Sequence, residues 1–503
     1  MNYIDTAKTQ IDRIIQDACA AAAQKGLLPS AGPLSGSVEI PRDLSHGDYA
    51  ANHAMAAARV MHMSPAAIAK ALLECMDLTG TYVGHVEIAG PGFMNFTLNQ
   101  DWYSDIIRNI QAEGPDFGRS DIGKGEKVMV EFVSANPTGP MTIGNARGGV
   151  LGDALASVLD RAGYSVWREF YVNNAGNQVD LFGRSIEARY LQLILGEDAV
   201  EFPDNGYHGD DIRELAAEIR EKYGDAYVSA DPEERRKTFI AYALPRNIER
   251  MKQDLARYRI HFDQWFLESD LHDSGYVAET VDLLTKNGYT YEKDGALWLN
   301  NTALGIRPEN LHFLIMQMVR LTRDGETIKV SKRTGKALTL SDLLDEISCD
   351  ACRFFFNAKP DTHLEFDLGL AVRQDSENLV YYVQYAHARI CSLIAALAAE
   401  GHSVGDAGAL DLSVLSSDTE RDLIRQLSLL PEEIKLSARD MDPSRINRYV
   451  IEVAARFHRF YNACRIKGEA EDVLGARLKL ADVTRQVIRN CLEIIGVTAP
   501  EKM

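Results

Sequence analysis

The sequence predicts a mixed α/β protein in which a doubly wound parallel sheet lies between a small α+β module and an all-helical bundle. In the middle of the chain, the apolar run Lys127–Val133 is followed by a Pro/Gly turn, a helical pattern and a second strand at Ser165–Tyr171. This is the pattern of a βαβ unit, which builds parallel sheets. After about residue 371, apolar residues recur with helical spacing almost throughout. A chain of 503 residues is also long enough for several such units.

The first region, residues 1–120, is predicted to be an α+β module. It opens with an amphipathic helix pattern that ends at a Gly/Pro/Ser break, Pro29–Ser37, before a short strand. Two helices and two alternating strands follow, at Ala51–Val60, Pro65–Met76, Tyr82–Ala89 and Gly92–Leu98.

The second region, residues 121–370, carries the parallel sheet. Lys127–Val133 is apolar without interruption, as expected for a strand covered on both faces. A helix is predicted at Asn145–Asp160, and charged helical segments at about 185–265 form an insertion laid on the sheet. Leu311–Leu321 is the next strand-like run.

The third region, residues 371–503, is predicted to be a helical bundle. Its helical segments are Val380–Leu397, Asp418–Leu430, Ser444–Ala463 and Leu474–Ile495.

Composition limits the function classes. A net charge of −19 argues against non-specific nucleic-acid binding over the whole surface, although a local basic face remains possible. The N-terminus has neither the basic head nor the apolar core of a secretory signal, and apolar runs stay well short of the ~20 residues of a membrane span. We therefore expect a cytoplasmic protein without membrane contact.

The seven cysteines are scattered, unlike a disulfide framework. Cys349 and Cys352 have CxxC spacing, but a metal or redox site would need a second pair nearby. We interpret them as small residues at the start of a helix and expect no metal.

The turn after Lys127–Val133 has the features of a phosphate site. Pro137–Pro140 breaks the strand, and Gly144, Gly148 and Gly149 allow close approach of a ligand to the backbone. The following helix start presents a positive dipole end. The alternative is that any βαβ unit needs a tight turn here.

The segment Lys329–Lys336, KVSKRTGK, places four cations around a glycine. Such a loop can hold a polyphosphate through lysine charges. A solvated charged turn is the alternative, and the turn at Pro137–Pro140 in the same domain argues against it.

These motifs resemble those of the bacterial arginyl-tRNA synthetases of class I. VEFVSANPTGP resembles the strand and turn before the family's HIGH signature, KVSKR its KMSKS loop, and EFYVNNAGNQ a segment that usually ends in Asp-Ala-Gly-Asn-Gln. LAVRQDSENLVYYVQYAHARI resembles the entry to its anticodon-binding domain, and the likeness extends to GVTAPEKM at the C-terminus. The resemblance implies a Rossmann-type catalytic domain that joins arginine to ATP and then to tRNA. The N-terminal module would contact the outer corner of the tRNA, and the helical domain its anticodon.

The resemblance also implies roles for individual residues. The HIGH and KMSKS positions are occupied by Thr142, Asn145, Lys329 and Lys332. ATP would be bound by Pro137, Gly139, Gly144, Ser331 and Lys332, and the amino acid by Glu131, Ser134, Asn136 and Asn174. In the helical domain, cations for phosphates and aromatics for splayed bases suggest tRNA contacts at Tyr382, Arg389, Arg448, Arg456, Arg459 and Tyr461. The alternative to a tRNA-binding surface is an ordinary helical bundle with its aromatic side chains inside and its cations solvated. We expect a monomer that binds tRNA, with no permanently bound cofactor and with ATP and Mg²⁺ only if the site is functional.

Three departures from the family fall in the catalytic domain. Thr142 stands where a histidine belongs, and the loss of one preorganised donor costs roughly 10²–10³ in rate. Asn174 replaces an aspartate. After Gly305, a crossover unit of roughly 30 or more residues is missing, and with it an acid for the substrate guanidinium. The parallel sheet should therefore be one strand short, with Leu311–Leu321 packed close to Lys127–Val133.

The favoured interpretation is a tRNA-binding relative of the synthetases in which arginine activation is lost or strongly impaired. One alternative is an active arginine–tRNA ligase in which other residues replace the missing segment. A second alternative is an enzyme that uses ATP or charged tRNA on another small molecule. A gene-model error would be a further explanation of the gap.

Overall fold

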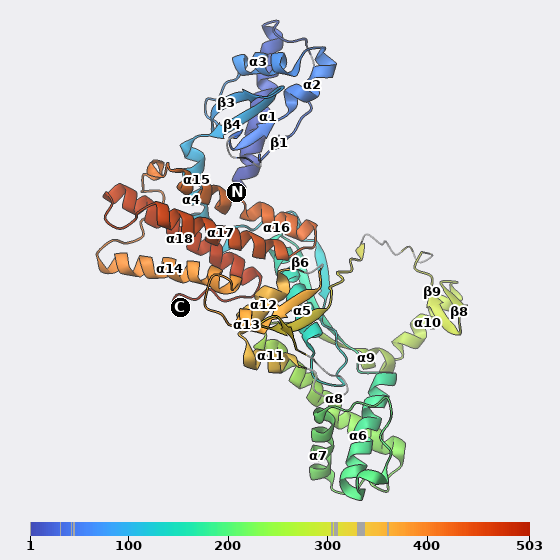
Figure 1. Ribbon diagram of the computed structural model, residues 1–503. Helices are drawn as coiled ribbons and strands as arrows, with labels where there is room; N and C mark the ends of the chain where they lie inside the picture. Colours follow the sequence, from blue (N-terminus) through green and yellow to red (C-terminus); the bar gives the residue numbers. More distant parts are fainter. Residues whose placement is uncertain are drawn as a thin grey trace.

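The computed structural model describes residues 2–30, 32–41, 43, 46–302, 305, 310–328, 338–359 and 362–503. Lys329, Ser331 and Lys332, which the sequence assigns to the phosphate site, lie outside these ranges. Figure 1 shows an elongated molecule, with the N-terminal module at one end, the bundle and the parallel sheet in the middle, and a helical insertion at the other end.

The N-terminal module packs three helices against a four-stranded antiparallel sheet of order β1-β2-β4-β3. Its helices are α1 (Tyr3–Gln24), α2 (His53–Met61) and α3 (Pro65–Cys75), and its strands are β1 (Val38–Glu39), β2 (Tyr49–Ala51), β3 (Val83–Ala89) and β4 (Phe93–Leu98). Helix α1 forms because Ile4, Ile11 and Ile15 recur on one face, which is buried, and because the Asn2 side chain caps its first turn.

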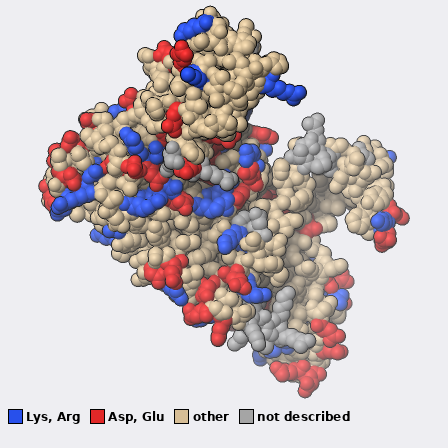
Figure 2. Space-filling view, turned by 45° about the horizontal axis from the view of Figure 1, so that its top comes forward, with Lys and Arg blue, Asp and Glu red and all other residues tan. Residues whose placement is uncertain are grey.

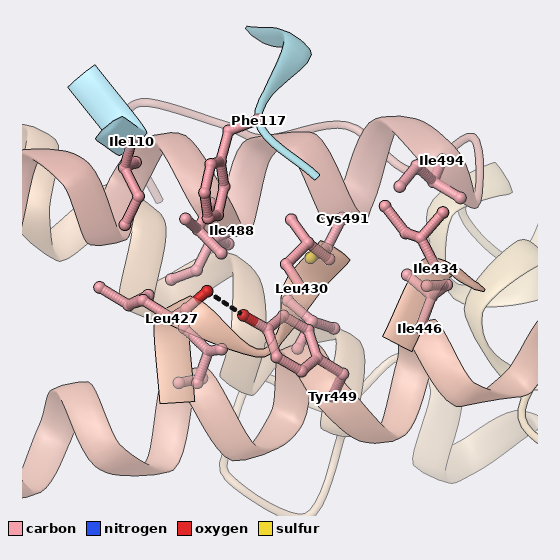
Figure 3. Close-up of a cluster of buried hydrophobic side chains, with 14 of the residues drawn as sticks. Ile110, Phe117, Leu427, Leu430, Ile434, Ile446, Tyr449, Ile488, Cys491 and Ile494 are labelled. Atoms are coloured by element: carbon pink, nitrogen blue, oxygen red, sulfur yellow. Dashed lines mark hydrogen bonds between the residues drawn. The ribbon is translucent and has the colours of Figure 1, made fainter. Parts of the chain in front are cut away.

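Helix α4 (Gln100–Glu113) and the 3-10 turn η2 (Gly114–Asp116) lead from the module into the centre of the molecule. The α4 residue Ile110 and the following Phe117 are buried in the apolar core of the C-terminal bundle (Figure 3). The N-terminal module is therefore joined to the bundle, although 265 residues (114–378) separate α4 from the first bundle helix.

The predicted βαβ unit is present. Strands β5 (Lys127–Glu131), β6 (Ser165–Val172) and β7 (Gln264–Leu267) form a parallel sheet in the order β5-β6-β7, with Lys127 opposite Ser165. Helix α5 (Ile143–Arg161) makes the crossover between β5 and β6. Its apolar face is buried from Ala146 through Leu159.

The predicted insertion forms a helical unit with a core of its own, separate from the main core. It comprises α6 (Asn177–Leu195), η3 (Glu197–Ala199), α7 (Asp210–Tyr223) and α8 (Pro232–Arg257). Phe182, Tyr190 and Phe239 are buried in that core. Figure 1 shows this unit at the end of the molecule farthest from the N-terminal module.

The chain then leaves the sheet through α9 (Glu268–Asp273), α10 (Tyr276–Lys286) and a two-stranded hairpin, β8 (Thr290–Lys293) and β9 (Ala296–Leu299). It returns in a second small sheet of order β11-β10-β12, in which β10 (Val319–Arg323) runs parallel to β12 (Leu364–Asp367) and antiparallel to β11 (Glu326–Thr327). Short helices α11 (Leu340–Glu346), α12 (Cys349–Asn357) and α13 (Leu368–Ala371) pack beside it.

Two expectations about the sheet are wrong. Among the described strands, β10 does not pair with β5, so Leu311–Leu321 is not packed onto Lys127–Val133 as predicted. Only the last three residues of that run lie in a strand, β10, because among the described strands the residues before them have no neighbour to pair with. For the same reason β5 is an edge strand that ends at Glu131, and Met129 is 58% exposed rather than covered on both faces.

The C-terminal bundle contains α14 (Leu379–Ala399), η6 (Leu412–Val414), α15 (Asp418–Ser428), α16 (Leu430–Arg439), α17 (Ser444–Ala463) and α18 (Glu471–Ile494). The predicted helix Asp418–Leu430 is in fact the first of two helices, because Pro431 starts a new one. Figure 3 shows the shared core, in which the Tyr449 hydroxyl donates to the Leu427 carbonyl at 3.1 Å. Within the described part of the chain, no helix combines the length and the apolar character needed to cross a membrane.

Candidate active site and nucleic-acid interface

A cleft of about 1460 Å³ opens at the carboxyl end of β5, where open parallel sheets place their ligands. The cleft is lined by the loop Val133–Met141, the start of α5 and the adjoining start of α11, and by residues of α7 and α8. Of the predicted catalytic, ATP-binding and arginine-binding residues, the cleft is lined by Ser134, Asn136, Gly139, Thr142 and Asn145.

The first turn of α5 is closed by a reciprocal capping box between Thr142 and Asn145. The Thr142 hydroxyl accepts a hydrogen bond from the Asn145 N–H (3.3 Å) and donates one to Asn145 Oδ1 (2.8 Å). The same Oδ1 accepts from the Thr142 N–H (2.9 Å). Threonine is a good N-cap residue, so this substitution for histidine stabilises the helix start while it removes a cationic group.

The turn is also tied to the segment that follows the Lys-rich loop. Thr142 and Thr339 form an isolated antiparallel bridge, and the Leu340 N–H donates to the Met141 carbonyl at 2.9 Å. The α5 turn and the start of α11 are therefore neighbours, whereas Lys329–Lys336 itself lies outside the described residues.

The backbone between β5 and the cleft is strained. Val133 and Ser134 have φ values of 67° and 39°, in the left-handed region that β-branched residues rarely adopt. The Ser134 hydroxyl oxygen accepts a hydrogen bond from the Tyr171 N–H at 3.1 Å, which fixes the turn against β6. Strain of this kind collects at functional sites, because only the surrounding structure can maintain it.

Other predicted site residues lie outside the cleft. The side-chain amide of Asn174 makes two hydrogen bonds with Ser269. Its Nδ2 donates to the Ser269 hydroxyl, and its Oδ1 accepts from the Ser269 N–H, both at 2.9 Å. Glu131 stands beside Glu169 in the register of β5 and β6. Pro137 contributes its carbonyl to the Asn247 side chain (2.9 Å), and Gly144 is likewise not among the lining residues.

The acidic wall of the cleft was not predicted from the sequence. It consists of Asp210, Asp211, Glu214, Asp254 and Asp342. Burial raises the pKa of both Asp211 and Asp254 above the usual range. The insertion and α11 bring these residues together from distant parts of the sequence, so spacing gave no signal for them.

In the bundle, α14 and α17 form an aromatic and cationic surface that includes three predicted tRNA contacts, Tyr382, Arg389 and Tyr461. The Arg389 guanidinium lies over the Tyr461 ring, 4.2 Å from its centre, and 5.9 Å from that of Tyr385. The Tyr382 ring is 5.0 Å from that of His458. Burial, together with the nearby Arg389, lowers the pKa of His458.

Tyr381, Tyr385 and His458 were missed as members of this surface. Tyr381 and Tyr385 stack with ring centres 6.0 Å apart. The four-residue spacing of Tyr381, Tyr385 and Arg389 on one helical face was the signal that could have found them.

The remaining predicted tRNA contacts are arginines held by acids of the bundle itself. Arg448 pairs with Asp442 (2.8 Å), whereas Arg456 and Arg459 share Asp422 (3.2 and 3.5 Å). Figure 2 shows basic side chains in a band across the bundle with acidic ones among them. These arginines are thus positioned by their partners.

The CxxC cysteines lie in α12. Burial raises the pKa of both thiols, that of Cys352 to about 12. In the part of the chain that the structure describes, no group of three or more acidic, histidine or cysteine side chains is arranged to hold a metal ion.

Comparisons with known proteins match the chain along its length. Residues 9–98 match the arginyl tRNA synthetase N-terminal domain, residues 107–309 the class I (R) tRNA synthetase catalytic domain, and residues 383–503 the DALR anticodon binding domain. The arginine–tRNA ligases of Acetivibrio thermocellus and Caldanaerobacter subterraneus are 47% and 45% identical, over the whole of both chains in each case. The structure of arginyl-tRNA synthetase from Thermus thermophilus, 18% identical, shares the fold with a TM-score of 0.68 over 98% of this chain and 100% of that chain.

These comparisons bear on the predicted loss of activity and on the gap. The relatives are named arginine–tRNA ligases, so they support the alternative of an active enzyme better than the favoured interpretation of a degenerate one. The alignment with the Acetivibrio thermocellus protein spans 562 positions, whereas this chain has 503 residues, so at least 59 aligned positions have no counterpart here. From its matches in all three domains, the chain belongs to the arginyl-tRNA synthetase family.

Proposed function

We propose that the protein is a monomeric arginine–tRNA ligase, which activates arginine with ATP and transfers it to the end of arginine tRNA. The observation that carries this proposal is the match of all three regions, in order, to relatives of that name. In this proposal residues 1–120 contact the outer part of the tRNA, residues 121–370 perform the chemistry, and residues 371–503 bind the anticodon loop.

The cleft at the end of β5 is the proposed reaction site. ATP, carrying Mg²⁺, enters with its phosphates toward the start of α5, where the helix dipole is positive. Gly139 leaves room at the turn, and Asn145 is a polar group at the same helix start. By resemblance, Lys329, Ser331 and Lys332 contact the phosphates.

Arginine is proposed to bind between Ser134 and Asn136 on one wall and the acidic side chains on the other. A guanidinium in a partly buried site needs negative partners, or its desolvation is costly. The five carboxylates of Asp210, Asp211, Glu214, Asp254 and Asp342 supply such charge. They are candidates to replace the acid that the missing segment carries in relatives.

The tRNA surface of the bundle is proposed to combine stacking with charge. Tyr382, Tyr385 and Tyr461 offer ring faces to unstacked bases, and Arg389 adds charge beside them. Arg448, Arg456 and Arg459 exchange their carboxylate partners for phosphates when RNA is bound.

A second candidate function is tRNA binding with arginine activation lost or strongly impaired. One specific observation favours it: the parallel sheet is interrupted between β5 and β10, next to the reaction site. At least 59 positions of the relatives are also absent from this chain.

The two candidates are separated by measuring arginylation and tRNA binding on the same preparation. The assay contains purified protein, an arginine tRNA transcript, radioactive arginine and Mg-ATP, and Lys237→Ala, an exposed lysine of α8, is the control for Lys332→Ala. Arginylation that Lys332→Ala abolishes and Lys237→Ala retains supports the ligase. Salt-sensitive tRNA binding with arginylation no faster than a protein-free blank assigns the second candidate. Absence of both overturns both.

A further inference from the structure

Exposed apolar side chains are concentrated in one short stretch of the molecule. Of the 26 large apolar side chains exposed in the described part of the chain, twelve lie between residues 276 and 318, which is less than a tenth of the sequence. They include Trp298 (50% exposed), Phe313 (80%) and Ile315 (76%). Figure 2 shows the projecting α10–β8–β9 unit mostly in tan, with charged side chains toward its far end. Apolar surface of this kind marks a contact that is not satisfied within the chain.

The described part of the chain also contains unpaired strand edges. Strand β5 pairs with β6 on one side, and no described strand occupies its other edge. Residues 311–318 have the apolar sequence of a strand but belong to none. Strand β5 and the run 311–318 both contact α5. For the run, Arg147 of α5 donates hydrogen bonds to the carbonyls of Gln317 and Met318.

The relatives carry additional chain, and the resemblance to the family implies that it belongs after Gly305. The match to the catalytic domain family ends at residue 309, just before the unpaired run. At least 59 aligned positions of the Acetivibrio thermocellus relative have no counterpart in this chain. One strand and a helix need about 30 residues, so a segment of that length is enough to fill the edge and cover the hairpin.

We infer that the free edge of β5, the run 311–318 and the α10–β8–β9 unit form a docking site for a separate polypeptide segment. That segment adds one apolar β-strand beside β5 and a helix over the exposed hairpin. This inference rests on the proposed function and deepens it, because the carboxyl end of a strand added parallel to β5 would lie beside Val133–Asn136 and complete the reaction cleft.

A second copy of this chain is a poorer occupant. Each copy has the same incomplete edges, and every described strand of the copy already belongs to a sheet. Pairing of two β5 edges about a two-fold axis would leave the run 311–318 of both copies without a neighbour. The missing element is a strand with a helix, and only a different segment provides it.

The test uses the full chain and a labelled peptide. The peptide is the segment of the Acetivibrio thermocellus relative that aligns with no residue of this chain, and its fluorescence anisotropy is followed as protein is added. We expect saturable one-to-one binding that Phe313→Asp and Ile315→Asp each weaken by about tenfold or more. Val60→Asp, at an apolar side chain of the N-terminal module that is 73% exposed, is the matched control and should bind as the wild type does.

Several outcomes would overturn the inference. These are no binding of the peptide, equal binding of a scrambled peptide, and equal binding by Phe313→Asp. A concentration-dependent dimer in light scattering that Phe313→Asp abolishes would assign the surface to a second copy instead. Arginylation is measured separately, with and without the peptide. Binding without arginylation leaves the docking site standing and removes the proposed function, whereas arginylation without binding does the reverse.

Discussion

The C-terminal bundle and the parallel sheet belong to one chain, yet the first is complete and the second is not. In the bundle, α15, α17 and α18 share a closed apolar core, and Glu420 is almost fully buried with Arg477 as its partner at 2.7 Å. In the sheet, Met129 and the run 311–318 are exposed, and β5 has an open edge.

The difference follows from where each element finds its hydrogen bonds. A helix makes its backbone hydrogen bonds within itself, so it can still form when a neighbouring segment is missing from the sequence. A parallel strand depends on other strands for every backbone bond, and those strands come from distant segments. Removal of one segment therefore leaves the helical parts of this fold intact and leaves the strands around the gap without partners.

The largest expected effect compares a phenylalanine in each region. Phe457→Ala in α17 removes a fully buried ring and should lower the free energy of unfolding by about 3–5 kcal/mol. Phe313→Ala should change it by no more than about 0.5 kcal/mol, because that ring is exposed. Denaturant unfolding of both variants checks this. Similar losses in the two variants would mean that the run 311–318 is packed in solution and would remove the contrast.

The second prediction concerns the capping box. Thr142→His restores a cationic donor at the start of α5 and should raise the arginylation rate by roughly 10²-fold. It should also cost about 1 kcal/mol of stability, because histidine is a poorer N-cap than threonine. Steady-state arginylation and thermal unfolding measure the two effects. Thr142→Ser keeps the cap without an imidazole, and a similar gain in that variant would contradict the explanation.

The third prediction tests the joint between the N-terminal module and the bundle. Buried Asp48 accepts hydrogen bonds from the Leu98 N–H, the Tyr103 hydroxyl and Arg425 of the bundle. Asp48→Asn should cost about 1–3 kcal/mol and make the module more susceptible to proteolysis, since Arg425 loses its carboxylate. The control is Lys435→Ala, which breaks the exposed pair with Asp5 and should cost less than about 1 kcal/mol. Equal protease resistance in both variants would show that the joint does not depend on Asp48.

The smallest expected effect is a pH dependence of the bundle. Burial lowers the pKa of His387 and His458 below the ordinary 6.5, so the folded protein favours their neutral forms. The unfolded chain binds protons below about pH 6.5, and stability should therefore fall as the pH drops through that value toward the lowered pKa values. Thermal midpoints at pH 7.5 and 5.5 measure this. His458→Gln should reduce this loss of thermal stability between pH 7.5 and 5.5, whereas His85→Gln, at an exposed site, should not. An unchanged loss in His458→Gln would exclude the His458 imidazole as a cause.

The sequence predicts much of the fold because its signals are local. Helix α17 begins and ends at the predicted residues, and the turn between β5 and α5 is where Pro137–Pro140 places it. The extent of the strands was not predictable in the same way. Whether Leu311–Leu321 forms a strand along its whole length depends on a neighbour that no described strand provides.

In the candidate site too, residues within one continuous motif were predicted and residues brought together by folding were not. Ser134, Asn136, Gly139, Thr142 and Asn145 were found because they lie within one continuous motif. The acids Asp211 and Asp254 were missed because only the folding of the insertion brings them to that motif. Asn174 was assigned to substrate from its place in a motif, yet its amide is engaged by Ser269.

The contact between Asp48 and Arg425 also sets an order of events during synthesis. The two residues are 377 positions apart, and a ribosome adds roughly 5–20 residues each second. The end of the N-terminal module at residue 120 lies 305 positions before Arg425, so the module is complete for roughly 15–60 s before that docking partner has been made. During that time the face of α4 that carries Ile110 must remain soluble on the nascent chain, and it is the last part of the module to be covered.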